Sequence, residues 1–63
     1  MQILELVKIL PTGNLLVRTK DKKLADDYWI GKMFLDYDGK TWYCFAYGEA
    51  EDGYCYMRMG THD

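Results

Sequence analysis

The side chains best suited to covalent or metal chemistry are two cysteines and one histidine. Cys44 and Cys55 are far apart in the sequence, and His62 is the only histidine in the chain. Zinc sites usually need four ligands in closely spaced pairs, so this set does not predict a metal site. A cysteine nucleophile would need His62 as its base, and the tail of the chain would then have to reach a thiol in the interior. The sequence therefore predicts neither a metal centre nor cysteine catalysis.

Other catalytic sets are also missing from the sequence. The chain contains no serine, which excludes a serine nucleophile. Asp26 and Asp27 are adjacent, so their carboxylates point to opposite faces of a strand or lie about 100° apart around a helix. No glycine-rich stretch has the spacing of a phosphate-binding loop. We therefore expect a protein that is not an enzyme and needs no cofactor.

Length and composition limit the size and the core of the domain that would carry a binding site. The 63 residues are 49% hydrophobic and 16% aromatic, which is unlike the polar composition of disordered chains. A domain of this size buries only about 60% of the surface that its unfolded chain exposes. We expect a single small domain, residues 1–63, and the question is whether its core can hide all of its apolar side chains.

Charge is distributed unevenly along the chain. The net charge is −2, which does not favour binding to phosphates through overall charge. Residues 1–23 are mainly basic and residues 24–63 mainly acidic, an asymmetry that can steer a charged partner or attract a second copy. A homodimer is therefore one alternative. Mimicry of nucleic acid by carboxylates is disfavoured, because most of the acidic residues lie in expected turns.

The first ten residues, MQILELVKIL, are apolar but include Glu5 and Lys8. They lack the basic start and the small-residue cleavage site of a signal peptide, and a membrane-spanning helix needs roughly 20 apolar residues. We therefore expect a cytoplasmic protein with no membrane partner. In the reducing cytoplasm, Cys44 and Cys55 are expected to remain free thiols that pack as small apolar side chains.

Three turn signals divide the sequence: PTGN at 11–14, DYDG at 36–39 and GEAEDG at 48–53. The segments between them are short and rich in β-branched and aromatic residues, which predicts an antiparallel all-β domain. We expect five strands in a small SH3-like barrel or a twisted meander sheet. An OB-like barrel and a dimeric open sheet are the alternatives.

The segment DKKLADDYW interrupts the strands after residue 20. Asp21 can cap a helix, and Leu24 and Tyr28 have the spacing of neighbours on one helical face. A short helical connector is therefore expected, packed against the sheet through Leu24, Tyr28 and Trp29.

The turns fix the strand register to different degrees. In the first hairpin, a two-residue turn pairs Leu10 with Val17, whereas a four-residue loop pairs Leu10 with Leu15, and the sequence leaves both open. In the second hairpin, Asp38-Gly39 is the typical sequence of a two-residue type I′ turn. That turn pairs residues 31–36 with residues 41–46.

The acidic loop 48–53 is expected to close the third hairpin with Tyr47 opposite Tyr54. Because directly paired residues share a face of the sheet, these registers sort the residues into two sets. The first set, expected to form the core, is Gly31, Met33, Leu35, Trp42, Cys44, Ala46, Cys55, Met57 and Met59. The second set, expected to form a contact face, is Ile30, Lys32, Phe34, Tyr43, Phe45, Tyr47, Tyr54, Tyr56 and Arg58.

Tyrosine dominates the second set. Its ring offers a large rigid contact area and its hydroxyl tolerates water, which is why tyrosine is enriched at protein interfaces. The predicted partner-binding residues are Lys32, Tyr43, Phe45, Tyr47, Tyr54, Tyr56 and Arg58. In the competing interpretation, the first hairpin or the helical connector folds over this face and buries it.

Two kinds of partner fit such a face. Single-stranded nucleic acid stacks its bases on aromatic rings beside a basic groove, but here few basic residues are near, and Glu49, Glu51 and Asp52 would repel phosphates. We therefore expect a protein-binding module, an adaptor or stoichiometric inhibitor that occupies a surface of another protein. Small proteins of phages and mobile elements fit this description. A single-stranded nucleic-acid-binding β-barrel is the alternative.

Overall fold

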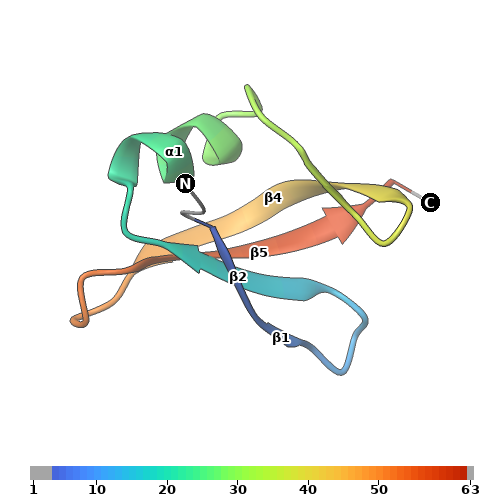
Figure 1. The fold of residues 1–63 in the computed structure, drawn as a ribbon, viewed down its shortest axis with the longest axis horizontal. Coiled ribbons are helices and arrows are strands. Elements are labelled where there is room, and N and C mark those ends of the chain that lie inside the picture. The colour runs from blue at the N-terminus through green and yellow to red at the C-terminus, as the bar shows by residue number, and fades with distance from the viewer. Residues whose placement is uncertain (1–3, 63) are drawn as a thin grey trace.

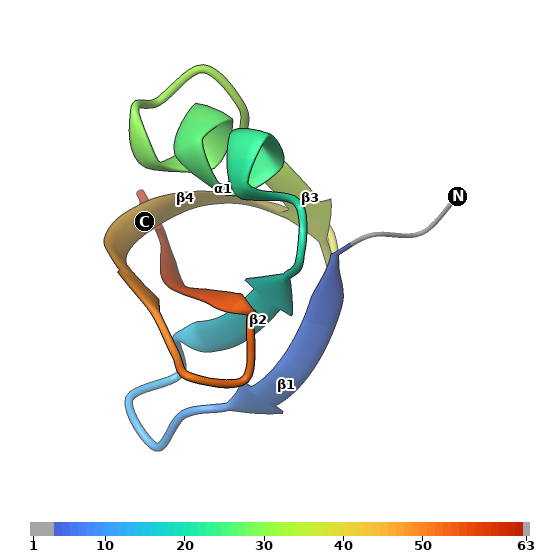
Figure 2. The same ribbon diagram turned by 90° about the vertical axis from the view of Figure 1, so that its left-hand side faces the viewer.

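The computed structural model describes residues 4–62, which form an antiparallel sheet and one helix (Figure 1). The elements are β1 Glu5–Ile9, β2 Leu15–Thr19, α1 Lys22–Trp29, β3 Leu35–Tyr37, β4 Lys40–Glu49 and β5 Cys55–Thr61. The strand order is β1-β2-β5-β4-β3. The sheet curls into a half-barrel with β1 and β3 at its two edges (Figure 2). The prediction of a small five-stranded all-β fold with a short helical connector is therefore confirmed.

The central pairing of the sheet joins β2 to β5. Its inward pairs are Leu15–Met59, Val17–Met57 and Thr19–Cys55. All six side chains are buried, because alternate residues of a strand point to the same face. The intervening residues of β2, Leu16 and Arg18, are only half-buried. The first hairpin therefore extends the sheet at its edge and does not fold over either face.

The core lies on the concave side of the sheet, between the strands and α1. Its buried members are Leu15, Val17, Ala25, Tyr28, Trp42, Cys55, Met57 and Met59. Leu24, Leu35, Cys44 and Tyr47 pack around them, half-buried. Burial of a leucine- or methionine-sized side chain contributes about 1.5–3 kcal/mol, so these few residues supply much of the stability.

The helix begins as the sequence predicts. Asp21 is the N-cap, and its carboxylate accepts a hydrogen bond from the backbone N–H of Leu24 at 3.1 Å. Ala25 and Tyr28 are buried against the sheet. Trp29, which we expected to pack inward, is 46% exposed at the last position of α1, where its ring packs against that of Tyr47.

The second hairpin has the predicted turn. Asp38 and Gly39 have φ of 55° and 74°, as a type I′ turn requires, and the ladder pairs Leu35 with Trp42. The longer ladder predicted for residues 31–34 is wrong. The N–H groups of Lys32 and Met33 instead donate to the backbone oxygen of Asp27, which holds this segment at the end of α1. Gly31 and Met33, predicted to be in the core, are exposed.

The other two hairpins have three-residue loops, and the registers predicted for them are wrong. The N–H of Leu10 donates to the oxygen of Asn14 at 2.8 Å, and that of Ala50 donates to the oxygen of Tyr54 at 3.1 Å. The third residue of each loop is a glycine with φ of 88° or 85°. Three-residue loops that end in a left-handed residue are common in hairpins. Both hairpins therefore close in a register that differs from the ones considered above.

A β-bulge in β4 moves side chains between the two faces. The ladder between β4 and β5 skips Phe45, directly after Cys44. An extra residue in one strand inverts the alternation beyond it. The bulge and the three-residue loop between β4 and β5 together make Tyr47 pair with Met57 rather than with Tyr54. Tyr47 consequently points to the concave side and not to the predicted contact face.

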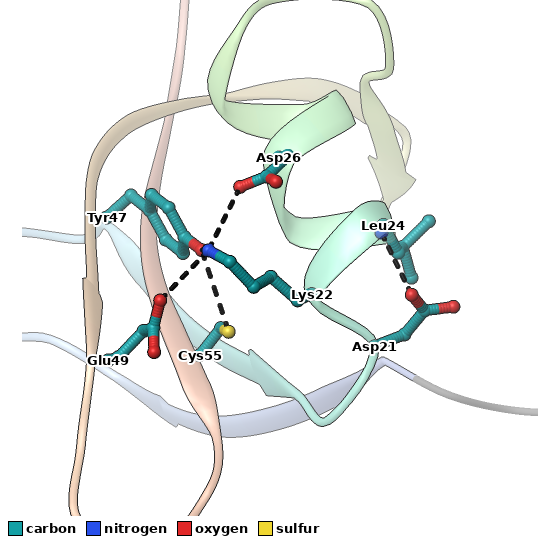
Figure 3. Close-up of polar contacts among 7 residues, drawn as sticks. All are labelled: Asp21, Lys22, Leu24, Asp26, Tyr47, Glu49 and Cys55. Atoms are coloured by element: carbon teal, nitrogen blue, oxygen red, sulfur yellow. Dashed lines mark hydrogen bonds and ion pairs between the residues drawn. The ribbon is translucent and has the colours of Figure 1, made fainter.

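Lys22, the first residue of α1, connects the helix to the end of β4 (Figure 3). Its ammonium group donates to Glu49 at 2.9 Å and to the hydroxyl of Tyr47 at 3.3 Å, and lies 3.8 Å from the carboxylate of Asp26. Glu49 and then Tyr47 raise the pKa of the Lys22 ammonium above its usual range. The Tyr47 hydroxyl donates in turn to the sulfur of Cys55 at 3.6 Å. These contacts fix Tyr47 on the helix side.

The two cysteines are free thiols, as predicted. Cys44 pairs with Met59, whereas Cys55 pairs with Glu49 at the far end of β4. At about 3.3 Å per residue, the two cysteines are roughly 15 Å apart along the sheet. A disulfide needs Cα atoms within about 7 Å, so the two cysteines are too far apart to form one in this fold.

Both thiols are expected to react slowly with Ellman's reagent in the folded protein. Cys55 is buried, and burial raises the pKa of the Cys44 thiol while its sulfur donates to the backbone oxygen of Ala46 at 3.3 Å. Because the thiolate is the reactive form, labelling at pH 8 is expected to be at least tenfold slower than in guanidinium chloride. Rapid labelling of a Cys44→Ala variant, in which Cys55 alone can react, would contradict its burial.

Candidate partner-binding face

The two sides of the sheet differ in what covers them. The concave side is filled by the core and α1, whereas no element between residues 4 and 62 lies over the convex side. We call the outward side chains of β2, β4 and β5, together with Tyr54, the convex face. Its members are Leu16, Arg18, Tyr43, Phe45, Ala46, Tyr54, Tyr56 and Arg58.

One half of the convex face is an assembly of tyrosine and basic side chains. The guanidinium carbon of Arg18 lies 4.1 Å from the centre of the Tyr54 ring, and the Lys20 ammonium lies 5.0 Å from it. Arg18 also donates to the carboxylate of Glu5 at 2.8 Å. The rings of Tyr54 and Tyr56 are tilted against each other with centres 6.3 Å apart. Cation–π contacts of this kind hold both partners in place.

Asp52 fixes the position of this assembly at the edge of the β4–β5 loop. Its carboxylate accepts hydrogen bonds from the Tyr56 hydroxyl at 2.6 Å and from the Tyr54 N–H at 3.0 Å. These two bonds, that of Tyr56 foremost, lower the pKa of Asp52. Tyr56 and then Glu5 raise the pKa of Arg18 above its usual range. The groups therefore keep their charges throughout the physiological pH range.

The other half of the convex face is aromatic around the β-bulge. The ring of Tyr43 stacks on His62 at 4.6 Å and is tilted against Phe45 at 6.3 Å. Gly60 lies beneath the Phe45 ring, since a Cβ atom there would be 3.5 Å from that ring and 3.3 Å from the side-chain amide of Asn14. The Phe45 ring therefore lies over Gly60, on the outward side of β5.

A shallow groove separates the two halves. It encloses about 380 Å³ and is lined by Leu16, Ala46, Tyr47, Gly48, Tyr56 and Arg58. Arg58 is exposed at its side and forms no ion pair with any residue from 4 to 62. No carboxylate among the described residues therefore neutralises this guanidinium at the side of the groove.

The structure places five of the seven predicted site residues on the convex face, namely Tyr43, Phe45, Tyr54, Tyr56 and Arg58. The prediction that Tyr47 and Lys32 share this face is wrong. Tyr47 packs its ring 6.0 Å from that of Trp29, and Lys32 follows α1. Ala46, assigned to the core, faces outward instead. The sequence analysis missed Arg18 and Lys20, since only the β2–β5 register places the alternating residues of β2 beside the tyrosines.

The convex side carries positive charge although the whole chain does not. Its basic side chains are Lys8, Arg18, Lys20 and Arg58, and its acidic side chains are Glu5 and Asp52. Both carboxylates are already bonded, to Arg18 and to Tyr56 respectively. The net charge of the chain is −2, because its eight other carboxylates outweigh its four other basic side chains.

Two further searches of residues 4–62 gave negative results. No group of three or more histidine, cysteine, aspartate or glutamate side chains in this range is arranged to hold a metal ion. No helix in it has the length and apolar character needed to cross a membrane. Comparison of the chain with models of protein families, with curated proteins and with solved structures finds no match.

Proposed function

We propose that this protein is a non-catalytic binding module that docks on another protein through the convex face. The observation that supports this most is the gathering of three tyrosines, a phenylalanine and two arginines on the one side of the sheet that α1 leaves open. Tyrosine and arginine are the residue types that most often dominate the energy of protein interfaces. An adaptor or a stoichiometric inhibitor would use such a face.

The side chains of the convex face are already held in place before binding. Arg18 is fixed by Tyr54 and Glu5, and Tyr56 is fixed by Asp52. Immobilising a flexible side chain at an interface costs about 0.5–1.5 kcal/mol, and this cost is reduced where the free protein already orders the residue. The fixed arrangement therefore favours binding through this face.

The charge of the face indicates the kind of partner. Four basic and two bonded acidic side chains favour a partner whose contact surface is acidic and partly apolar. Binding would work by steric occupation, since the face offers contact area and no reactive group. Free thiols at Cys44 and Cys55 fit a reducing compartment such as the cytoplasm.

The double substitution Tyr56→Ala/Arg58→Ala is expected to weaken capture of the partner from lysate at least tenfold. Each residue is of a type that often contributes 2 kcal/mol or more at an interface. The matched control is Lys32→Ala/Phe34→Ala, which removes an exposed aromatic and a basic side chain on the helix side. Pull-down at equal protein concentration measures the effect, and circular dichroism checks the fold. Equal loss in both variants would contradict the assignment of the face.

Single-stranded nucleic acid is the second candidate partner, favoured by the positive charge of the convex side. Two contacts argue against it. Arg18 already covers a face of the Tyr54 ring, and the carboxylate of Asp52 lies beside Tyr56, where it would repel phosphates. Fluorescence anisotropy with labelled dT20 and rU20 at 50 and 200 mM salt separates the candidates. Tight binding that weakens steeply with salt would favour nucleic acid over a protein partner.

A further inference from the structure

A groove lies on the concave side, between the two edges of the half-barrel. It encloses about 490 Å³, a volume within the range of about 300–1,000 Å³ that is usual for ligand sites. Its walls come from Leu4, which directly precedes β1, and from β1, β2, α1 and β3. The residues that line it include Leu6, Val17, Leu24, Tyr28, Leu35 and Asp36. None of these belongs to the convex face.

The edge of the sheet beside this groove is formed by β1. Within residues 4–62, β1 pairs only with β2, so one row of its backbone N–H and C=O groups has no strand partner. Leu6, Val7 and Ile9 are large apolar side chains, exposed on this strand. Proteins usually shield such edges with charges, bulges or a covering element. In β1 the charged residues Glu5 and Lys8 and a bulge between Leu6 and Lys8 are such features, but no described strand or helix pairs with or covers its outer edge.

β3, on the other side of the groove, is equally open. It is a three-residue strand that pairs only with β4 among the described residues. The two edges therefore flank an apolar groove at the point where a further strand would complete the curl of the sheet. The occupant that such a site fits is an extended chain, because only an extended backbone bonds to a strand edge along its length.

The charge of the groove restricts the sequence of that extended chain. Asp36 is the single charged residue among those that line it. The Thr41 hydroxyl donates a hydrogen bond to one carboxylate oxygen of Asp36 at 3.0 Å. This bond uses only one of the two carboxylate oxygens. Burial raises the pKa of the Tyr28 hydroxyl, and the negative charge of the neighbouring Asp36 raises it further. A basic side chain of the occupant would complement this carboxylate.

We propose that this groove binds an extended segment of another protein as an added strand, with alternate apolar side chains in the groove and a lysine or arginine beside Asp36. The main chain of the segment bonds to the free edge of β1. Affinity then comes from these backbone bonds, and specificity comes from the side chains that enter the groove.

A second copy of this chain fits the groove less well. Its own β1 would present Leu6 on the inward side, while Lys8 pairs with Leu16 and therefore belongs to the outward side. Its β3 would bring a second Asp36 next to the first. Neither edge strand of a second copy would place a positive charge beside Asp36. We therefore assign the site to a different protein.

Selection of a phage-displayed library of random heptapeptides against the full chain tests this proposal. The selected peptides are expected to alternate apolar with other residues and to contain one lysine or arginine. A synthetic peptide from the selection is expected to bind at least tenfold more weakly to Leu6→Lys. The matched control is Ile30→Lys, because Ile30 is an exposed apolar residue, 58% against 44%, that lies at the end of α1, away from β1, and does not line the groove. Binding to Ile30→Lys is expected to stay within twofold of the wild type.

The substitution Asp36→Asn tests the charge separately. It keeps an acceptor for Thr41, and it is expected to abolish the preference for a lysine- over a glutamine-containing form of the peptide. In NMR spectra, the amide shifts on peptide addition are expected in β1 and β3.

Three results would overturn the proposal. The first is a selection without alternating peptides. The second is a set of NMR shifts confined to the convex face. The third is a dimer in light scattering that Leu6→Lys dissociates, which would assign the groove to a second copy. The convex face contributes no residue to this site, so either site can fail its test alone.

Discussion

Replacing Met57 with alanine is expected to lower the free energy of unfolding by about 2–5 kcal/mol, the usual cost of removing a large core side chain. Met57 is 0% exposed and lies at the centre of the sheet, paired with Val17 on one side and Tyr47 on the other. A domain of this length is expected to have a total stability of roughly 3–9 kcal/mol. The substitution therefore removes a large part of it, and a substantial fraction of the variant should be unfolded near 37 °C.

Urea denaturation followed by tryptophan fluorescence measures this loss. The matched control is Met33→Ala, because Met33 is an exposed methionine in the segment after α1. Surface substitutions usually change stability by less than about 0.5 kcal/mol. If both variants lost the same stability, the core would not be centred on β5 as described.

Replacing Ala25 with aspartate is expected to cost about 3 kcal/mol or more at neutral pH, since it places an unpaired carboxylate in the interface between α1 and the sheet. Ala25 is 0% exposed. The difference in helix propensity between the two residues is at most about 0.7 kcal/mol, so burial of charge dominates. Burial also raises the pKa of the introduced carboxyl above its unfolded value. The loss is therefore present above that raised pKa and shrinks as the pH falls through it.

The control for this prediction is Ala50→Asp, which introduces the same group in the exposed loop between β4 and β5. Its effect is expected to be small at every pH. Guanidinium chloride titrations at pH 5 and pH 8 compare the two variants. An Ala25→Asp protein with the stability of the control would show that α1 does not pack on the concave side.

The parts of the fold that the sequence predicted depend on local chemistry. Asp38 and Gly39 both adopt positive φ, and few residue pairs other than Asn-Gly or Asp-Gly do so readily, so the turn and its register follow from the sequence. The helix start at Asp21 is equally local, because the capping oxygen and the N–H that it bonds are three residues apart. Such features need no knowledge of the rest of the chain.

The parts that could not be predicted depend on a choice between two apolar faces. In β4 both faces carry large apolar residues, so alternation alone does not reveal that Phe45 is an extra residue. The predicted register of the third hairpin is wrong because that prediction places Gly48, the first of the two glycines in the acidic loop, in the turn. The structure places Gly48 inside β4, and only the second glycine bends the chain.

The residues of the convex face were predictable where they come from one hairpin. Tyr56 and Arg58 alternate on β5, Tyr54 directly precedes that strand, and the alternation of the three is visible in the sequence. Arg18 joins them only because β2 pairs with β5, and no local signal specifies which distant strand a hairpin joins. The positive charge of the convex face was missed for the same reason.

The pairing of β2 with β5 also determines how fast this protein can fold. The other strand pairs are hairpins, and an isolated hairpin forms in about 1–10 microseconds. The pairing of Leu15 with Met59 instead joins residues from distant parts of the sequence, and closing so long a loop loses chain entropy before contacts compensate. Pairing of β2 with β5 is therefore the expected rate-limiting step of folding. Substitutions at Val17 should slow folding, whereas changes in the Asp38-Gly39 turn should mainly alter the unfolding rate.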